Sequence, residues 1–223
     1  MKLSHPDYLQ WMGIDTFQRK RVTESPARDE TGLADFDTLQ EEVKNCTACP
    51  LHCSRTQTVF ARGNPHARLM VIGEAPGFHE DREGKPFVGR AGKLLDAMLS
   101  AIGIDGNSVY IANILKCRPP GNRDPEASEI SQCTPFLDRQ IALAKPDLLL
   151  AVGRIAAHHL LKTKRPLGQL RQTLHTYGED QTPLIVTYHP AYLLRNPADK
   201  RRAYTDLQFA TRTLAGQEGK QDE

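Results

Sequence analysis

Two polar side chains suited to recognising a flat heterocycle stand at the ends of apolar segments. Asn113 ends the segment VYIAN, and its amide offers both a donor and an acceptor to the edge of a base. His189 follows LIVTY and is fixed by Pro190, a placement typical of a catalytic group at a strand end. Taken singly, each residue also has a structural interpretation, as a turn-forming asparagine or a packed histidine.

A glycine-rich stretch follows the first apolar segment and contains an aromatic residue. It reads GEAPG at 73–77 and GKPFVG at 84–89. Such glycines permit a tight turn and let a ligand approach backbone N–H groups. Phe87 lies between Pro86 and Val88, which would hold its ring rigidly as a stacking platform. The stretch is neither a dinucleotide fingerprint nor a P-loop, and the alternative is a purely structural loop.

The cysteines favour a metal or cluster site over disulfides. Their odd number, in a chain whose N-terminus lacks a secretory pattern, argues against a disulfide framework. A C-x-x-C pair and a second, distant pair are too irregular for a zinc ribbon, and thiolates from separated loops suit an iron–sulfur cluster. Zinc or unligated thiols remain the alternatives. The five cysteines are Cys46, Cys49, Cys53, Cys117 and Cys133.

Basic residues and one apolar pair are candidates for contacting a polyanion. The net charge of +2 neither requires nor excludes a nucleic-acid partner. Three basic runs, each after a predicted strand or helix end, indicate a phosphate-facing rim, although such runs are usually only solvated surface. Leu193 and Leu194 are predicted in an exposed loop, as ordinary packing or as a wedge into a base stack. The runs are Lys116, Arg118, Arg123; Lys162, Lys164, Arg165, Arg171; and Arg195, Lys200, Arg201, Arg202.

These side chains must be positioned by alternating strands and helices. Short apolar runs bounded by turn residues predict buried strands at 69–73, 109–113, 147–153 and 184–188. Helical patterns lie at 35–45, 94–102, 126–143, 155–161 and 199–214. We therefore expect an α/β fold, a three-layer αβα arrangement with a central, mostly parallel four-stranded sheet. In such folds ligands bind beyond the carboxyl ends of the strands.

Length and composition limit the class of protein. The 223 residues, 39% of them hydrophobic, can bury a sizeable core, which excludes a wholly disordered chain. No apolar run approaches membrane-spanning length, and the N-terminus carries no apolar signal region, so we expect a cytoplasmic protein without membrane contact. We expect a partly flexible extension and linker at 1–34, one domain at 35–214, and a polar tail at 215–223.

Taken together, four separated motifs resemble a known family. GEAPG, ED-x-x-G-x-PFVG-x-AG, N-x-x-KCRPP-x-NR-x-P and TYHPAYLLR-x-P occur in order, and the chain resembles family 4 uracil-DNA glycosylases, the iron–sulfur branch, from about Cys46 to Leu214. The resemblance implies a monofunctional hydrolase that flips uracil out of DNA, cleaves the N-glycosidic bond and leaves an abasic site. It further implies a 4Fe-4S cluster and uracil-containing DNA as partner, and we expect a monomer.

The resemblance assigns a role to each matching position. Glu74, Ala75 and Pro76 would line the uracil pocket, with Glu74 also orienting the attacking water. Phe87 would stack on the extruded base, Asn113 would pair with its edge, and His189 would stabilise the departing anion. The cluster ligands would be Cys46, Cys49, Cys117 and Cys133, with Cys53 a spare thiol. Expected DNA contacts are Arg118, Arg123, Arg171, Leu193, Leu194 and Arg195.

Some positions depart from the family pattern, and other functions remain as alternatives. Gln172 stands where a glycine commonly follows the arginine of the late loop, which leaves the DNA contact of Arg171 less certain. No basic insertion lies between Lys116 and Cys133, so covalent trapping of DNA is not expected. The glutamate of GEAPG separates the chain from family 5. The alternatives are a non-catalytic iron–sulfur DNA-binding or redox module, and a nucleotide-binding or DNA-polymerase accessory domain.

Overall fold

A six-stranded sheet forms the middle layer of the computed structural model, which describes residues 31–218. The strand order is β1-β3-β2-β4-β6-β5. The four inner strands run parallel, as expected, and the two short edge strands pair antiparallel to their neighbours. The strands are β1 (Arg62–Gly63), β2 (Leu69–Gly73), β3 (Tyr110–Asn113), β4 (Leu148–Val152), β5 (His175–Tyr177) and β6 (Thr182–Thr187).

The edge strands correct the expectation of a four-stranded sheet. Strands β1 and β5 are only two and three residues long, with no fully buried position in either. Segments this short and this exposed carry no periodic apolar signal in the sequence, so they could not be predicted from it. The inner strands are almost fully buried on both faces, which is why they appear in the sequence as continuous apolar runs.

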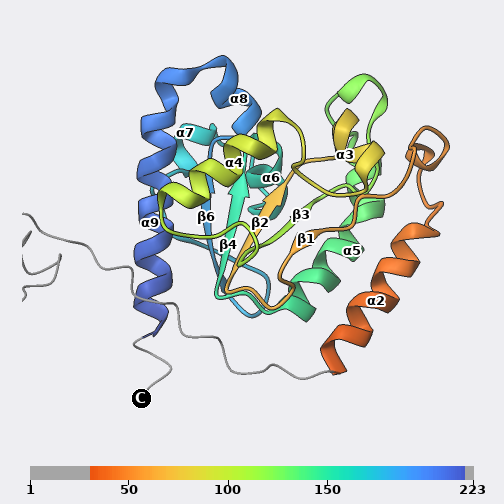
Figure 1. Ribbon diagram of the computed structural model, residues 1–223, viewed down its shortest axis with the longest axis horizontal. Coiled ribbons are helices and arrows are strands. Elements are labelled where there is room, and N and C mark those ends of the chain that lie inside the picture. Colours follow the sequence, from red (N-terminus) through yellow and green to blue (C-terminus); the bar gives the residue numbers. More distant parts are fainter. Residues whose placement is uncertain (1–30, 219–223) are drawn as a thin grey trace, which may run out of the picture.

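Helices cover both faces of the sheet and complete the three layers (Figure 1). Alternate side chains of each inner strand point to opposite faces, so that Met70 and Ile72 join one core and Leu69 and Val71 the other. The first core is closed by α2, α5, α6 and α7, and the second by α4 and α9. The α-helices are α2 (Thr31–Lys44), α3 (Phe78–Glu83), α4 (Arg90–Ala101), α5 (Ala127–Ala144), α6 (Arg154–Leu160), α7 (Leu167–Leu170), α8 (Pro190–Arg195) and α9 (Lys200–Glu218), and the short 3-10 turns are η1 (Pro50–Cys53), η2 (Pro120–Asn122) and η3 (Pro197–Asp199).

The helix boundaries refine the expected domain limits. Helix α2 begins at Thr31, inside the predicted linker, and α9 continues past Leu214 to Glu218, inside the predicted tail. The remaining parts of those two predictions, residues 1–30 and 219–223, lie outside the described residues. Within the described part, none of the helices combines the length and the apolar character needed to cross a membrane.

The carboxyl ends of the parallel strands meet at one edge of the sheet, the upper edge in Figure 1, where α3 and α8 also lie. Gly73 and Asn113 end β2 and β3, and their Cα atoms are register partners. Gly153 directly follows β4, and His189 lies two positions after the end of β6. The topology therefore brings the predicted site residues to a single edge.

Candidate active site

Phe87 and His189 lie next to each other at this edge. Their ring centroids are 5.8 Å apart, with an angle of 32° between the ring planes. Phe87 comes from the loop between α3 and α4, and His189 from the end of β6, so strands two places apart in the sheet deliver the two rings. The aromatic platform and the imidazole that the sequence predicts as one site are thus brought together.

The backbone of Phe87 is held in an unusual conformation. Its φ angle is +55°, in the left-handed region that bulky side chains rarely adopt. The Glu80 carboxylate accepts hydrogen bonds from the N–H groups of Val88 and Gly89, both at 3.0 Å. A Cβ at Gly92 would lie 1.7 Å from the Phe87 carbonyl oxygen, so only glycine fits there. Strain of this kind persists where surrounding contacts enforce it, and it is typical of functional sites.

Asn113 faces the same place with an unpaired amide oxygen. Its side chain is buried, and its Oδ1 is without a hydrogen-bond partner among the described residues. A Cβ added at Gly73 would lie 2.4 Å from this Oδ1 and 2.6 Å from the Phe87 ring. The absence of a side chain at Gly73 therefore leaves the amide and the ring side by side. A buried orphan acceptor costs stability unless a ligand satisfies it.

His189 is held as a neutral imidazole with a defined tautomer. Its Nδ1 accepts a hydrogen bond from the Ala191 N–H at 3.1 Å, so the neutral ring carries its proton on Nε2. Burial, assisted by the positive charge of Arg195, lowers the pKa of His189 to about 4. The ring also packs over Gly153, where an added Cβ would lie 2.8 Å from the His189 Cβ. His189 is therefore a fixed, uncharged hydrogen-bond donor at neutral pH.

The GEAPG loop is bonded to the segment that follows β3. The Ile114 and Leu115 N–H groups donate to the carbonyls of Gly73 and Glu74 at 3.0 and 3.1 Å. Of the predicted pocket residues, Pro76 is buried, and Glu74 and Ala75 are half-buried. Burial and the nearby Asp124 carboxylate raise the pKa of Glu74 to about 7, while Arg154 opposes the shift. Glu74 therefore titrates near neutral pH, the range suited to proton transfer.

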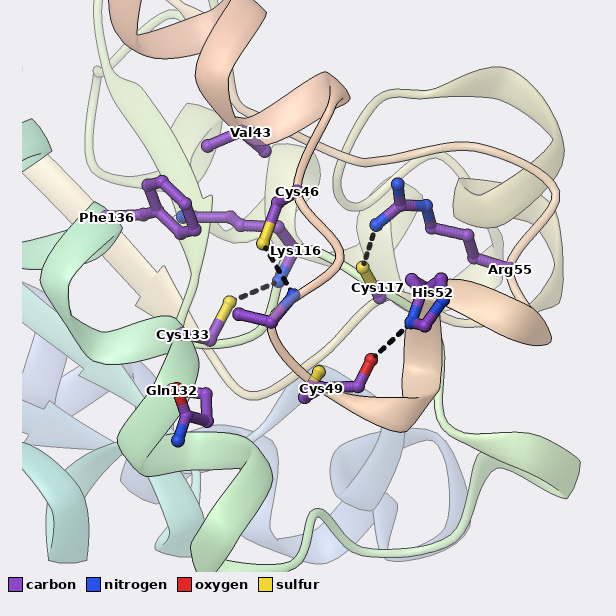
Figure 2. Close-up of a pocket in the computed structure, with 11 residues that line it drawn as sticks. Val43, Cys46, Cys49, His52, Arg55, Lys116, Cys117, Gln132, Cys133 and Phe136 are labelled. Atoms are coloured by element: carbon purple, nitrogen blue, oxygen red, sulfur yellow. Dashed lines mark hydrogen bonds between the residues drawn. The ribbon is translucent and has the colours of Figure 1, made fainter.

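The four predicted cluster cysteines surround one pocket. Figure 2 shows their sulfur atoms facing a common space, below α2 and beside α5. Cys117 and Cys133 are buried and pack in a small apolar cluster with Leu51 and Leu115. Cys53 does not line this pocket and is exposed. All five cysteines are free thiols in the structure.

Three of the pocket thiols accept hydrogen bonds from the protein (Figure 2). The Lys116 N–H donates to Cys133 Sγ at 3.3 Å, the Ala48 N–H to Cys46 Sγ at 3.5 Å, and an Arg55 guanidinium N–H to Cys117 Sγ at 3.1 Å. Donors aimed at sulfur stabilise thiolates, the form that binds a metal or cluster. Burial has the opposite effect and raises the pKa of Cys117 and, to about 11, the pKa of Cys133.

The fully buried Lys116 lines the thiol pocket and is also bonded to Asn113. Its ammonium donates to the Asn113 carbonyl at 2.7 Å and to the Gln140 amide oxygen. Gln140 in turn donates to the Tyr110 hydroxyl at 2.9 Å. The sequence interpretation placed Lys116 in a basic run facing phosphate. This is wrong, because the ammonium group is buried and donates its hydrogen bonds within the protein.

Two of the predicted DNA-binding arginines are instead paired within the protein. Arg171 forms a bidentate ion pair with the fully buried Asp206, at 2.7 and 3.0 Å, and stacks over Tyr188 at 4.3 Å. Its side chain is only 10% exposed, so a phosphate contact by Arg171 is wrong. Arg123 pairs with Glu129 at 2.5 Å but stays partly exposed. Arg195 is exposed, and Arg118 is half-buried with its guanidinium bonded to Asn122.

The apolar pair after His189 separates into two roles. Leu193 and Leu194 lie in helix α8 rather than in a loop. Leu193 is fully buried, so the predicted DNA contact by Leu193 is wrong and its role is packing. Leu194 is 36% exposed, and its insertion into a base stack stays a prediction. Successive helical residues point in different directions, which explains why only one of the pair reaches the surface.

The departure at Gln172 has a structural explanation. Its φ angle is +57°, a conformation in which glycine is the usual residue. The Gln172 side chain donates to Asp206 Oδ1 at 2.6 Å, a hydrogen bond that glycine lacks. The loop therefore keeps a glycine-like backbone, and the amide side chain stabilises it.

Sequence reasoning assigned no role to Glu80, although it quoted the residue in the ED-x-x-G motif. The structure shows that its carboxylate holds the backbone after Phe87. The only available signal was an acidic residue near the start of a short glycine-bounded helix, a common feature of helix N-termini. The internal hydrogen bonds of Lys116 were also missed, because a lysine in a polar motif is normally expected at the surface.

The fold and site define an α/β protein in which an aromatic ring, an amide and an imidazole converge at the carboxyl edge of the sheet. The sequence model described as the Uracil DNA glycosylase superfamily matches residues 60–210. The chain therefore belongs to the uracil-DNA glycosylase superfamily, in its type-4 branch.

Several curated relatives support this placement. The chain is 40% identical over 179 residues to a type-4 uracil-DNA glycosylase of Pyrobaculum aerophilum. The matched region covers 78% of this chain and 91% of the relative. It is 42% identical to those of Sulfurisphaera tokodaii and Thermotoga maritima, over 73% and 75% of this chain and 77% and 87% of the relatives.

Proposed function

We propose that this chain is a uracil-DNA glycosylase that flips uracil out of DNA, hydrolyses its N-glycosidic bond and leaves an abasic site. The observation that carries the proposal is the convergence of Phe87, Asn113 and His189 at one edge of the sheet. The partner is uracil-containing DNA. The expected monomeric state and cytoplasmic location remain predictions.

Base recognition follows from the paired ring and amide. Flipping a nucleotide costs a few kcal/mol of unstacking, which stacking on Phe87 offsets. The orphan Oδ1 of Asn113 accepts from the uracil N3–H, while its amide N–H donates to O4. Cytosine inverts this pattern at both positions and would leave the buried amide unpaired, so it is rejected.

His189 contributes to catalysis as a hydrogen-bond donor. As the N-glycosidic bond breaks, negative charge develops on the leaving uracil, and a preorganised donor stabilises it. The Nε2–H of a neutral, desolvated imidazole is such a donor. Backbone N–H groups of the loop after Gly73 are further candidates for this role. A neutral ring also avoids repulsion with the cationic sugar that forms at the same moment.

Glu74 is the candidate for handling the water nucleophile. Hydrolysis needs a water positioned on the sugar side of the slot and a group that accepts its proton. Glu74 is half-buried and its pKa of about 7 leaves part of it ionised at neutral pH. Its carboxylate form orients the water and takes up the proton.

We further propose that Cys46, Cys49, Cys117 and Cys133 hold a 4Fe-4S cluster. Four thiols facing one space with N–H donors on three sulfurs suit this group. When bound, the cluster ties together the segment after α2, the loop after β3, and α5.

The decisive test of the activity is release of uracil. The purified protein is incubated with an oligonucleotide containing a single uracil, and alkali then cleaves any abasic site. We expect cleavage at the uracil position only, and free uracil in the supernatant. An absorbance spectrum of the same preparation tests the cluster, with a broad band in the visible range expected from iron–thiolate ligation. DNA binding with no uracil released would favour the non-catalytic module instead.

A further inference from the structure

A large aromatic side chain is exposed beside the proposed uracil slot. Phe78 is 47% exposed and is the first residue of α3, directly after the GEAPG loop. An exposed phenylalanine ring places apolar surface in contact with water, which is unfavourable because the ring has no polar group. The position of Phe78 in the catalytic region makes this exposure informative.

Two unpaired cations surround this ring. The guanidinium carbons of Arg82 and Arg118 lie 5.5 and 5.2 Å from the ring centroid. Across the part of the chain that is described, neither guanidinium is in an ion pair with a carboxylate, whereas Arg123 and Arg171 are. The His79 ring meets Phe78 edge-on at 5.5 Å. The surroundings therefore combine a half-exposed aromatic ring with two positive charges that no carboxylate in the described part of the chain neutralises, although the Arg118 guanidinium also donates to Asn122 Oδ1 at 2.7 Å.

The location of this group is set by the two loops that form the slot. Phe78 lies four positions after Glu74, and Arg118 five positions after Asn113. The two loops are bonded to each other through Leu115 and Glu74 at 3.1 Å. Figure 1 shows α3 at the upper edge of the sheet, next to the loop that follows β3. Phe78 and Arg118 therefore lie on the same two loops as Glu74 and Asn113, close to the proposed position of the flipped base.

We propose that Phe78, Arg82 and Arg118 form a binding site for an unstacked nucleotide adjacent to the flipped uracil. The base stacks on the Phe78 ring, and the guanidinium groups contact its phosphates. Stacking on an aromatic side chain is sequence-tolerant, because every base has a π face. In a duplex the neighbouring base stays paired and stacked, and in single-stranded DNA it is free. The site thus favours single-stranded uracil-containing DNA, an inference that rests on the proposed function.

The first experiment compares Phe78→Leu and Phe78→Trp with the parent protein on single-stranded and duplex uracil-containing DNA. For Phe78→Leu we expect the half-saturating concentration of single-stranded DNA to rise by about tenfold, with less than about a twofold change for duplex. The maximal single-turnover rate should stay unchanged, and Phe78→Trp should bind like the parent. Equal weakening on both substrates, or no weakening on either, overturns the proposal.

The second experiment observes stacking without any cleavage. The oligonucleotide carries 2-aminopurine next to a 2′-fluorinated uridine that resists hydrolysis. Binding of the parent protein should quench the stacked fluorophore, and Phe78→Leu should abolish the quenching. The control is Tyr204→Leu, since Tyr204 is 43% exposed on α9, on the other side of the molecule from α3 (Figure 1).

The two experiments separate failure of the inference from failure of the proposed function. If the parent releases no uracil from either substrate, the glycosylase proposal fails, whatever the fluorescence shows. If uracil is released but 2-aminopurine reports the same environment in the parent and in Phe78→Leu, only the stacking site is wrong. Matching melting temperatures for the variants would exclude unfolding, which is not expected at an exposed side chain.

Discussion

The Phe87 ring lies 5.8 Å from the imidazole of His189, centroid to centroid, although the two residues come from opposite halves of the chain. The glycosylase hypothesis required this proximity, because a stacking platform and a donor to the leaving base have to contact the same ring. Rings on opposite faces of the sheet would have ended the hypothesis. With the pair in place, the predictions below concern what each group contributes.

Replacing His189 should slow the chemical step and leave DNA binding largely intact. Removing one preorganised donor to a developing anion costs about 10²–10³ in rate. We therefore expect His189→Ala to reduce the single-turnover rate of uracil release by about this factor, with a dissociation constant for DNA close to that of the parent. The control is His158→Ala, because His158 lies on α6 and its imidazole bonds to the Arg165 carbonyl rather than to a proposed site residue. An unchanged rate would remove His189 from the mechanism.

The pH dependence of the rate should report Glu74. Its pKa of about 7 means that the carboxylate form, which accepts a proton from water, increases between pH 6 and 8. The pKa of His189, at about 4, adds no titration in this range. We expect the single-turnover rate to rise through this window with a midpoint near 7, and Glu74→Gln to be slow and independent of pH. A rising profile in Glu74→Gln would contradict the assignment.

Ionisation of Glu74 should also lower the free energy of unfolding at alkaline pH. Because folding raises its pKa from 4.5 to about 7, the native state binds more protons than the unfolded state between these values. The free energy of unfolding therefore falls as pH rises through this window. Glu74→Gln removes that loss, so its melting temperature should exceed that of the parent by a few degrees at pH 8 and by less at pH 5. Thermal unfolding at both pH values checks the difference.

Asn113→Leu should stabilise the free protein while strongly reducing uracil release. The substitution removes a buried amide oxygen with no partner and keeps a similar side-chain volume. An unsatisfied buried polar group costs about 1–3 kcal/mol, so we expect an increase toward the lower end of that range in the free energy of unfolding. Uracil release should fall by at least about a hundredfold. Denaturant unfolding and single-turnover assays measure the two effects, and a less stable, fully active variant would refute the assigned role.

The salt dependence of DNA binding should separate Arg118 from Arg171. Each lost phosphate contact reduces the slope of log K against log salt by about 1. We expect this reduction for Arg118→Ala. Arg171→Ala should leave the slope unchanged and instead lower the free energy of unfolding by about 3 kcal/mol, since it strands the buried Asp206. A reduced slope with full stability in Arg171→Ala would reverse our correction.

Loss of one cluster thiol should remove iron, and loss of the spare thiol should not. Cys133 is buried in the pocket wall, whereas Cys53 is exposed outside it. We expect Cys133→Ala to lose the visible absorbance band of the cluster and to bind little iron. Cys53→Ser should keep both at the level of the parent. Full iron content in Cys133→Ala would show that a different ligand set is used.

Several features of the fold could be read from local pattern. The inner strands are continuous apolar runs because both of their faces are covered, and the predicted segment 69–73 matches β2 at both ends. Strand β5 was missed because its three residues are too few to show a period. The left-handed backbone of Phe87 was also beyond local reasoning, since it depends on contacts from Glu80 and Gly92.

The sequence by itself determined which chemical groups are available and the order in which they follow the strands. That was enough to place Phe87, Asn113, His189 and the four cysteines, because the carboxyl ends of parallel strands always share one edge. Only the tertiary structure decided which basic side chains are exposed and which are buried and paired within the protein. Arg171 and Lys116 are basic in the sequence, but Asp206 and Gln140, distant along the chain, bury and pair them. Burial and pairing depend on neighbours in space, and a linear pattern does not contain them.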